Sequence, residues 1–286
     1  MTPLRMAALG DSLTEGLGDL AADGSWRGWA ALLADGLAPV AEAVDLRNLA
    51  VSGARTADVL HRQLPWAQQH RPQLASVLVG VNDTLRARYD IADVAHNLDA
   101  TMGALAADGA LLLTACLPDP GRMLGLPGPL ARPLARRMRS VNEVVHVLSG
   151  RYAGVHVHAA ACDWADDPRM WSVDRLHPSE RGHRALAREF HAPLAHRGVA
   201  QGPAPDPEPT GTVPTRSAQA WWMATKGTGW LLERSTDLLP DLFRLAATEA
   251  RRRNSDELDR EADRRTEAVL AALDSEQDRG SLRAVG

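Results

Sequence analysis

The chain has 286 residues, 45% of them hydrophobic, which is enough for one domain of about 200 residues with a full core plus an appendage. Its formal net charge is −4 and its pI about 6.2, so nothing in the composition favours a polyanion such as nucleic acid as a partner. No stretch has the pattern of a signal peptide or the ~18 consecutive apolar residues of a membrane span, which predicts a cytoplasmic protein without a transmembrane segment.

Up to about residue 196, short apolar runs alternate with longer helical patterns. This alternation is typical of a parallel sheet that is covered by helices on both faces. It predicts an α/β fold, a three-layer α/β/α sandwich around a five-stranded parallel sheet. The predicted strands are residues 4–9, 44–49, 74–79, 110–116 and 154–158. Helical patterns between and after them include residues 26–37, 91–107, 134–148 and 179–195.

A change of composition follows, because residues 201–214 read QGPAPDPEPTGTVP and so disfavour both helix and strand. This divides the chain into a domain at residues 1–200, a Pro/Gly-rich linker at 201–215 and a C-terminal helical extension at 216–286. Tryptophan and leucine gather in residues 218–243 of the extension, and acid–base pairs four residues apart follow from residue 256. The extension either docks on the domain, forms a lid or membrane-surface element, or binds a protein partner. Its nearly balanced charge disfavours attachment to anionic lipid.

The first chemical signal is Ser12, in the sequence Gly10-Asp11-Ser12 directly after the first predicted strand. Alone, these three residues are an ordinary turn sequence. Three further segments follow other strands, at residues 48–54 (NLAVSGA), 80–83 (GVND) and, just before the last helix of the domain, 174–178 (DRLHP). Because the carboxyl ends of parallel strands meet at one edge of the sheet, we expect these four segments to converge there.

Together the four segments supply the groups that acyl transfer requires. A serine hydroxyl becomes a useful nucleophile when an imidazole accepts its proton, and His177 is the candidate base for Ser12. Asp174 is the candidate carboxylate that orients and stabilises this imidazole. The negative charge of a tetrahedral intermediate needs fixed donors, for which the candidates are the backbone N–H groups of Ser12 and Gly53 and the side-chain amide of Asn82.

On these residues the sequence resembles the SGNH, or GDSL, hydrolase family, whose four blocks contribute serine, glycine, asparagine and histidine. The blocks appear here in order as GDSLTEG, the glycine of NLAVSGA, GVND and DRLH, and the resemblance covers about residues 5–196. It implies a flavodoxin-like sheet, no cofactor, and hydrolysis of esters or thioesters through an acyl-enzyme. The second glycine of the G-x-S-x-G elbow of α/β-hydrolases is absent around Ser12.

Two weaker signals do not predict a metal or a nucleotide cofactor. His156 and His158 point to the same face of a strand, but neither a carboxylate nor a third histidine stands near them at ligand spacing. Cys116 and Cys162 also lack the spacing of a metal knuckle or redox pair and are interpreted as buried free thiols. Gly16-Leu17-Gly18 lacks the third glycine of a dinucleotide-binding loop. We therefore expect neither a metal nor another cofactor.

Residues 118–139 form an unusually long connection between the fourth strand and the next helix. Our hypothesis is that this connection overhangs the pocket and shapes acyl or alcohol selectivity, the alternative being a plain solvated loop. The sequence thus predicts a serine esterase for a small-molecule ester with a small or medium acyl group. The alternatives are an acyltransferase or thioesterase with the same triad, and a non-catalytic binding protein on this fold.

Overall fold

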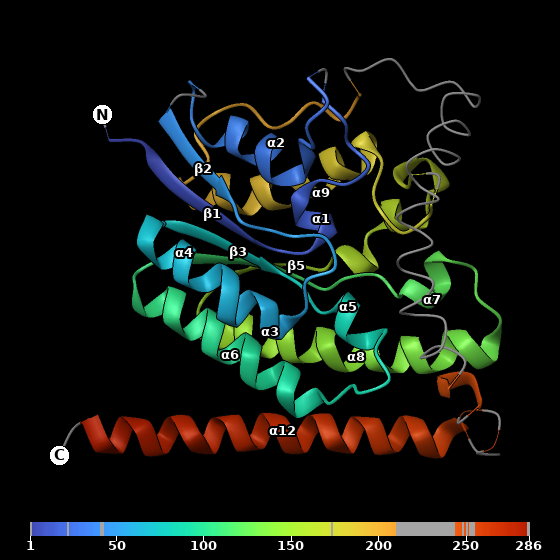
Figure 1. The fold of residues 1–286 in the computed structure, drawn as a ribbon. Coiled ribbons are helices and arrows are strands. Elements are labelled where there is room, and N and C mark those ends of the chain that lie inside the picture. Colours follow the sequence, from blue (N-terminus) through green and yellow to red (C-terminus); the bar gives the residue numbers. More distant parts are fainter. Residues whose placement is uncertain are drawn as a thin grey trace.

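The computed structural model describes residues 2–21, 23–40, 43–172, 174–209, 244–247, 249, 251 and 255–284. Five strands form one parallel sheet in the order β2-β1-β3-β4-β5 (Figure 1). This is the flavodoxin-like order, so the predicted α/β/α fold and its five-stranded parallel sheet are confirmed. The strands are β1 (Leu4–Gly10), β2 (Val44–Asn48), β3 (Leu74–Leu78), β4 (Leu111–Ala115) and β5 (Val155–Val157).

Helices cover both faces of the sheet (Figure 1). On one face, α2 (Gly28–Leu37) packs against α9 (Glu180–His196), and Trp29 stacks on Phe190 with ring centroids 5.0 Å apart. The other face carries α4 (Leu64–His70), α6 (Ile91–Ala107) and α8 (Gly128–Arg151). All five residues of the central strand β3 are buried, as expected for a strand enclosed between two helical layers.

Short helical segments connect these elements. They are α1 (Ser12–Glu15), α3 (Thr56–Asp58), the π-helical η2 (Val59–Gln63), α5 (Val81–Thr84), α7 (Pro120–Met123) and the 3₁₀ turns η3 (Ala159–Ala161), η4 (Asp163–Asp166) and η5 (Pro168–Met170). Helices α1 and α5 begin within three residues of the ends of β1 and β3, and α3 follows β2 after a loop. The chain therefore turns sharply at the edge of the sheet where the strands have their carboxyl ends.

The start of α8 differs from the prediction. The sequence predicts a helix over residues 134–148 and a long connection before it, whereas α8 begins at Gly128 and contains Pro133. Proline is well accommodated in the first turn of a helix, where Pro129 stands, because its missing N–H has no partner there. The connection is therefore short, and residues 128–139 are helical.

Beyond α9 the chain first runs without helix or strand over residues 201–209. Two arginines of α9 hold this segment, since Arg184 donates to the carbonyl of Asp206 at 3.0 Å and Arg188 to that of Pro205 at 2.8 Å. The tryptophan-rich residues 218–243 lie outside the described residues. The proposed domain boundaries therefore stay predictions.

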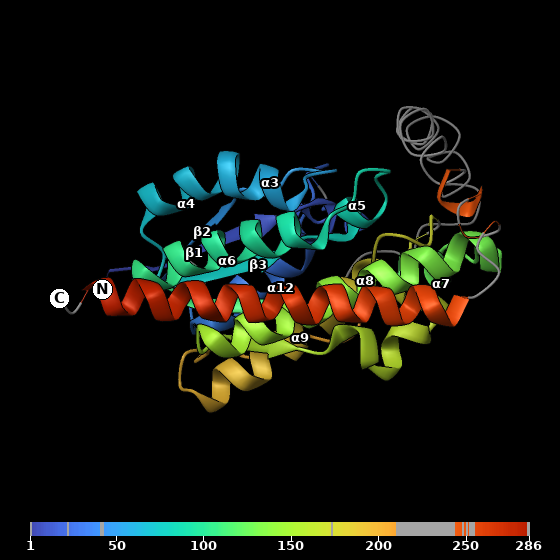
Figure 2. The ribbon, with the colours of Figure 1, turned by 90° about the horizontal axis from the view of Figure 1, so that it is seen from below.

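The last described element, α12 (Ser255–Ala284), lies along α6 and α8 on the side away from the sheet (Figures 1 and 2). Leu273 and Thr266 are buried in this contact, and the guanidinium of Arg136 on α8 pairs with Asp259 at 2.6 Å and with Glu249 at 3.0 Å. In the structure, α12 thus adds a further layer to the sandwich.

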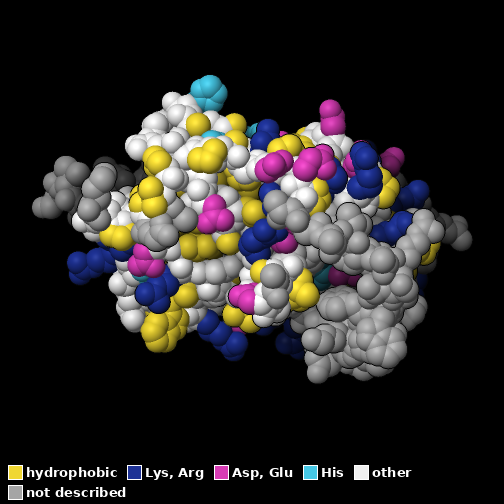
Figure 3. Space-filling view, turned by 90° about the horizontal axis from the view of Figure 1, so that it is seen from above, with side chains coloured by type: hydrophobic (Ala, Val, Ile, Leu, Met, Phe, Trp, Pro, Cys, Tyr) yellow, Lys and Arg dark blue, Asp and Glu magenta, His cyan; other side chains and the backbone are white. Residues whose placement is uncertain are grey.

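The distribution of charged side chains on the surface agrees with the nearly balanced charge of the sequence. Basic and acidic side chains are interspersed over the face shown in Figure 3. None of the helices in the described part of the chain combines the length and the apolar character that crossing a bilayer requires.

Candidate active site

Ser12 is the first residue of α1 and stands directly after β1. The Asp11 side chain caps this helix by accepting from the Leu13 N–H at 3.1 Å. Gly10 before it has φ +154°, and a Cβ atom there would lie 2.2 Å from the carbonyl oxygen of Leu78 on β3. Only glycine therefore allows the chain to leave the strand at this angle and present the serine hydroxyl at the edge of the sheet.

A buried glutamine fixes the same turn from the side. The amide of Gln63, in η2, accepts from the Gly10 N–H at 2.8 Å and donates to the Gly10 carbonyl at 2.8 Å. The two bonds satisfy both backbone groups of a residue in the sheet interior. Sequence reasoning missed Gln63, because a single glutamine in a helical pattern carries no signal of its partner 53 positions away.

Ser12 and His177 lie in hydrogen-bonding contact although 165 positions separate them. Ser12 Oγ is 2.8 Å from His177 Nε2, and His177 Nδ1 is 2.6 Å from Asp174 Oδ2. The imidazole is buried, with 4% of the residue exposed. The structure thus brings together all three side chains that the sequence singled out for acyl transfer.

The loop before α9 is built around the other oxygen of Asp174. Asp174 Oδ1 accepts from the backbone N–H groups of Leu176 at 2.9 Å and His177 at 3.0 Å, and from the Ser172 hydroxyl at 2.6 Å. Burial by itself would raise the pKa of Asp174, but the hydrogen bonds and the charge of His177 outweigh it and hold the pKa well below its usual range. Asp174 is therefore a carboxylate at neutral pH, with one oxygen for the turn and one for the imidazole.

The predicted oxyanion residues lie around the same turn. Asn82 Nδ2 donates to Asp11 Oδ2 at 3.1 Å and to the carbonyl of Ala54 at 3.1 Å. Gly53, at φ +82°, directly precedes Ala54, so the amide of Asn82 ties the Gly53 loop to the Ser12 turn. The segments after β1, β2 and β3 thereby meet at the turn that carries Ser12, as their places in the sheet predict.

Burial is the largest influence on Asp11 itself. It raises the pKa of Asp11 to about 6, against the opposing effects of the Leu13 N–H and of His177. Within one site the environment thus lowers the pKa of one carboxyl group, Asp174, and raises that of another, Asp11. Such opposed shifts are common at functional sites.

A narrow cavity of about 60 Å³ opens beside Ser12, Asn82 and His177. Its remaining walls are largely apolar and come mostly from the segments between β4 and α9 and from α9 itself. They include Leu117, Met123, Trp164, Trp171 and Leu186. Met123 belongs to the connection that the sequence singled out as a candidate for selectivity. The two tryptophans were missed, although Trp171 stands only three residues before Asp174.

One group among the described residues has the composition of a metal site. Side-chain ligand atoms of Cys116, His156 and His158 all lie within 4.8 Å of one another. The sequence shows neither a carboxylate nor a third histidine at ligand spacing from His156 and His158, so it does not predict a metal there. The fold brings a different residue, Cys116 directly after β4, beside them.

Comparisons with known proteins agree with this geometry. Residues 8–185 match the GDSL-like Lipase/Acylhydrolase family. No curated protein matches the chain significantly in sequence. The match to the family ends within α9, so α12 lies outside it.

Solved structures of similar fold include two esterases. One is the psychrotrophic esterase EstA from Pseudoalteromonas sp., with 21% identity and a TM-score of 0.53, the alignment covering 68% of this chain and 98% of EstA. Another is Axe2, an acetylxylan esterase from Geobacillus stearothermophilus, with 20% identity, a TM-score of 0.54 and coverage of 69% and 95%. A third structure is TesA, with 24% identity and a TM-score of 0.53, the alignment covering 66% of this chain and 97% of TesA. At identities this low, these similarities show a shared fold and nothing more specific.

Proposed function

Because the chain belongs to the GDSL-like lipase/acylhydrolase family, we propose that it is a serine esterase that cleaves carboxylic esters through an acyl-enzyme intermediate on Ser12. The observation that carries the proposal is the contact of 2.8 Å between Ser12 Oγ and His177 Nε2, with Asp174 on the other side of the imidazole. A binding site alone would not require a base and a carboxylate in line with a hydroxyl.

In the first half of the reaction, Ser12 Oγ attacks the ester carbonyl carbon while His177 Nε2 takes the hydroxyl proton. The imidazolium that forms is stabilised by Asp174, which also keeps Nδ1 protonated so that Nε2 is the base. Collapse of the tetrahedral intermediate breaks the bond to the alcohol oxygen, which receives the proton from Nε2. The acyl group is left on Ser12.

In the second half, a water molecule replaces the alcohol. His177 takes one proton from this water as its oxygen attacks the acyl carbon, and the same proton returns to Ser12 Oγ when the acid leaves. The serine and the imidazole are thereby restored. An acceptor other than water would make the same site an acyltransferase, and a thiol leaving group would make it a thioesterase.

The oxyanion of each tetrahedral intermediate would be met by the N–H groups of Ser12 and Gly53 and by the amide of Asn82. Such donors are worth about 3 kcal/mol each in related chemistry. Both protons of Asn82 Nδ2 are directed at Asp11 and Ala54, so the oxyanion would share or displace one of these bonds. The link to Asp11 holds the amide near the place where charge develops.

The cavity supports a short acyl group. Its volume of about 60 Å³ is several times the roughly 10–15 Å³ that a cavity needs to hold one water molecule. Its largely apolar lining suits a hydrocarbon chain of a few carbons better than a charged group. We therefore propose acetyl to butyryl esters as the preferred class.

The test combines an active-site label with a panel of chromogenic esters of increasing acyl length. We expect a fluorophosphonate probe to label the wild type once per chain, Ser12→Ala to lose this label, and kcat/KM of the variant to fall by several orders of magnitude. Ser275→Ala on α12 is the matched control and should keep both. An unlabelled wild type, or equal hydrolysis by Ser12→Ala, would refute the proposal. A clear preference for thioesters over matched esters would favour the thioesterase.

A further inference from the structure

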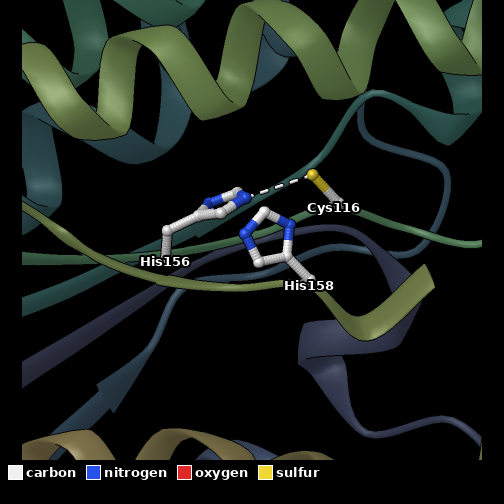
Figure 4. Close-up of side chains that lie close together, drawn as sticks. All are labelled: Cys116, His156 and His158. Carbon is white, nitrogen blue, oxygen red and sulfur yellow. Dashed lines mark hydrogen bonds between the residues drawn. The ribbon is translucent and has the colours of Figure 1, made fainter. Parts of the chain in front are cut away.

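We propose that Cys116, His156 and His158, with His146 as fourth side chain, form a binding site for a zinc-class transition-metal ion, separate from the Ser12 site. Figure 4 shows both imidazole rings of His156 and His158 beside the Cys116 sulfur. Cys116 Sγ lies 3.1 Å from His156 Nε2, and the ligand atoms of the three residues lie within 4.8 Å of one another. Zinc ligands lie about 2.0–2.3 Å from the ion, so two ligand atoms of a tetrahedral site are roughly 3.5 Å apart, and the more widely spaced atoms here would move about 1 Å closer together as an ion binds.

The sheet register builds this cluster. Thr114 is paired with His156 across β4 and β5, and the Cys116 N–H donates to the Val157 carbonyl at 2.9 Å just beyond the paired residues. Because side chains on a strand alternate between its faces, Cys116 and His158 continue the face that Thr114 and His156 begin. Two neighbouring strands thus present a thiol and two imidazoles on the same side of the sheet.

Helix α8 covers this face and adds a third imidazole. The ring of His146 lies 5.0 Å from that of His156 and 5.3 Å from that of His158, centroid to centroid. Asn142, one turn earlier on α8, holds the chain after Cys116 by accepting from the Leu117 N–H and donating to its carbonyl, both at 2.8 Å. The helix is therefore fixed in a rotation that turns His146 toward the two strand histidines.

A sulfur atom with three imidazoles is a donor set for zinc and related borderline ions, whereas calcium and magnesium require oxygen ligands. A bound cation would displace the thiol proton of Cys116 and stabilise the thiolate.

A hydrogen-bond chain behind His156 decides which of its two ring nitrogens can bind an ion. The Thr114 hydroxyl donates to Ser149 Oγ at 2.8 Å, and its oxygen lies 2.9 Å from His156 Nδ1. Because the hydroxyl proton is directed at Ser149, the Thr114 oxygen accepts from Nδ1–H, which leaves Nε2 free to face Cys116. Metal-binding histidines generally have their second nitrogen fixed in this way.

The site has an open side, since His146 and His158 are exposed to solvent. An ion can therefore enter without unfolding, and water can complete its coordination. Leu117 and Ala159 follow Cys116 and His158 directly and line the cavity beside Ser12. A bound ion would connect β4, β5 and α8 next to the cavity wall. We therefore expect the unfolding temperature of the protein to rise with the concentration of free metal ion.

The experiment uses the full chain, stripped of metal with a chelator and freed of any polyhistidine tag. Titration with Zn²⁺ in a calorimeter should give saturable binding of one ion per chain. Titration with Co²⁺ should produce a thiolate-to-cobalt charge-transfer band together with the visible bands of a four-coordinate ion. Neither readout depends on esterase activity, so the result is independent of the function proposed for Ser12.

Variants assign the ligands. Cys116→Ser should abolish the charge-transfer band, and His158→Ala, a change at an exposed residue, should weaken Zn²⁺ binding by at least about tenfold. Thr114→Val should weaken it by about ten- to a hundredfold through His156. Cys162→Ser, which removes the other thiol of the chain, is the matched control and should bind as the wild type does. Absence of saturable binding by the wild type, an unchanged band in Cys116→Ser, or loss of the band in Cys162→Ser would overturn the proposal.

Discussion

Two carboxyl groups near Ser12, the partly buried Asp174 and the buried Asp11, have opposite electrostatic environments. Asp174 accepts three hydrogen bonds on one oxygen and contacts the imidazole with the other, which lowers its pKa despite burial. Asp11 is buried and has fewer donors, from Leu13 and Asn82, and burial raises its pKa to about 6. Deeper burial, fewer donors and the lack of a direct bond to the imidazole thus distinguish Asp11 from Asp174, which stays charged at mildly acidic pH.

The raised pKa of Asp11 predicts a pH-dependent cost in stability. The folded protein binds this proton more tightly than the unfolded chain, whose reference value is 3.8. The cost is therefore absent well below pH 3.8, grows as the pH rises toward about 6, and is complete above it. Asp11→Asn removes the charge and should gain about 2 kcal/mol in unfolding free energy, relative to the wild type, between pH 4 and pH 7.

Denaturant unfolding of Asp11→Asn and wild type across this pH range measures the gain. A constant difference between the two proteins at every pH would contradict the prediction, even if the variant is less stable throughout because it loses part of its bond to Asn82. Only the change with pH reports the ionisation of Asp11.

At the scale of elements, the sequence predicts what depends on local pattern. Each strand agrees with its prediction to within one residue at each end, because apolar runs and their flanking turn residues are visible in the chain. The helix at residues 91–107 agrees at both ends, and Asp90 caps its start. The convergence of Ser12, Asn82 and His177 follows from the rule that parallel strands end at one edge.

Features that depend on register and helix rotation could not be predicted in this way. Cys116 meets His156 only because Thr114 pairs with His156, and His146 joins them only through the rotation of α8. Gln63 reaches Gly10 from a π-helical turn, a conformation without a sequence pattern. The start of α8 was missed because proline usually ends helices, whereas here Pro129 stands in the first turn.

The short helix α7 provides the next prediction, because it positions Met123 in the wall of the cavity. Met123→Ala removes most of a side chain from a cavity of about 60 Å³, so longer acyl chains should fit better. We expect the ratio of kcat/KM for octanoyl over acetyl esters to rise by about tenfold, a gain typical of one or two buried methylene groups.

Leu124→Ala is the matched control, because Leu124 is the next residue and is 37% exposed. Its ratio should stay that of the wild type. If both variants changed the ratio equally, the effect would come from loosening α7, and Met123 would have no specific part in selectivity.

At the scale of the whole molecule, the chain extends the family domain by a layer. The match to the family ends at residue 185, and α12 lies against α6 and α8 beyond it. One stripe of α12 faces these helices, with Thr266 and Leu273 buried and Val269 and Leu270 partly buried. This spacing of three and four residues is that of an amphipathic helix packed on a core. Arg136, with its partners Asp259 and Glu249, holds one end of the contact.

The last prediction tests whether α12 is packed on the domain in solution. Leu273→Asp places a charge among apolar side chains, where it has no partner, and should release the helix. We expect faster hydrogen exchange throughout α12 and cleavage within it by a protease at low concentration. Ala271→Asp introduces the same carboxylate two residues away on the exposed side of the helix and should leave both measurements unchanged. Equal exchange in the two variants would mean that the stripe around Leu273 does not hold the helix on the domain.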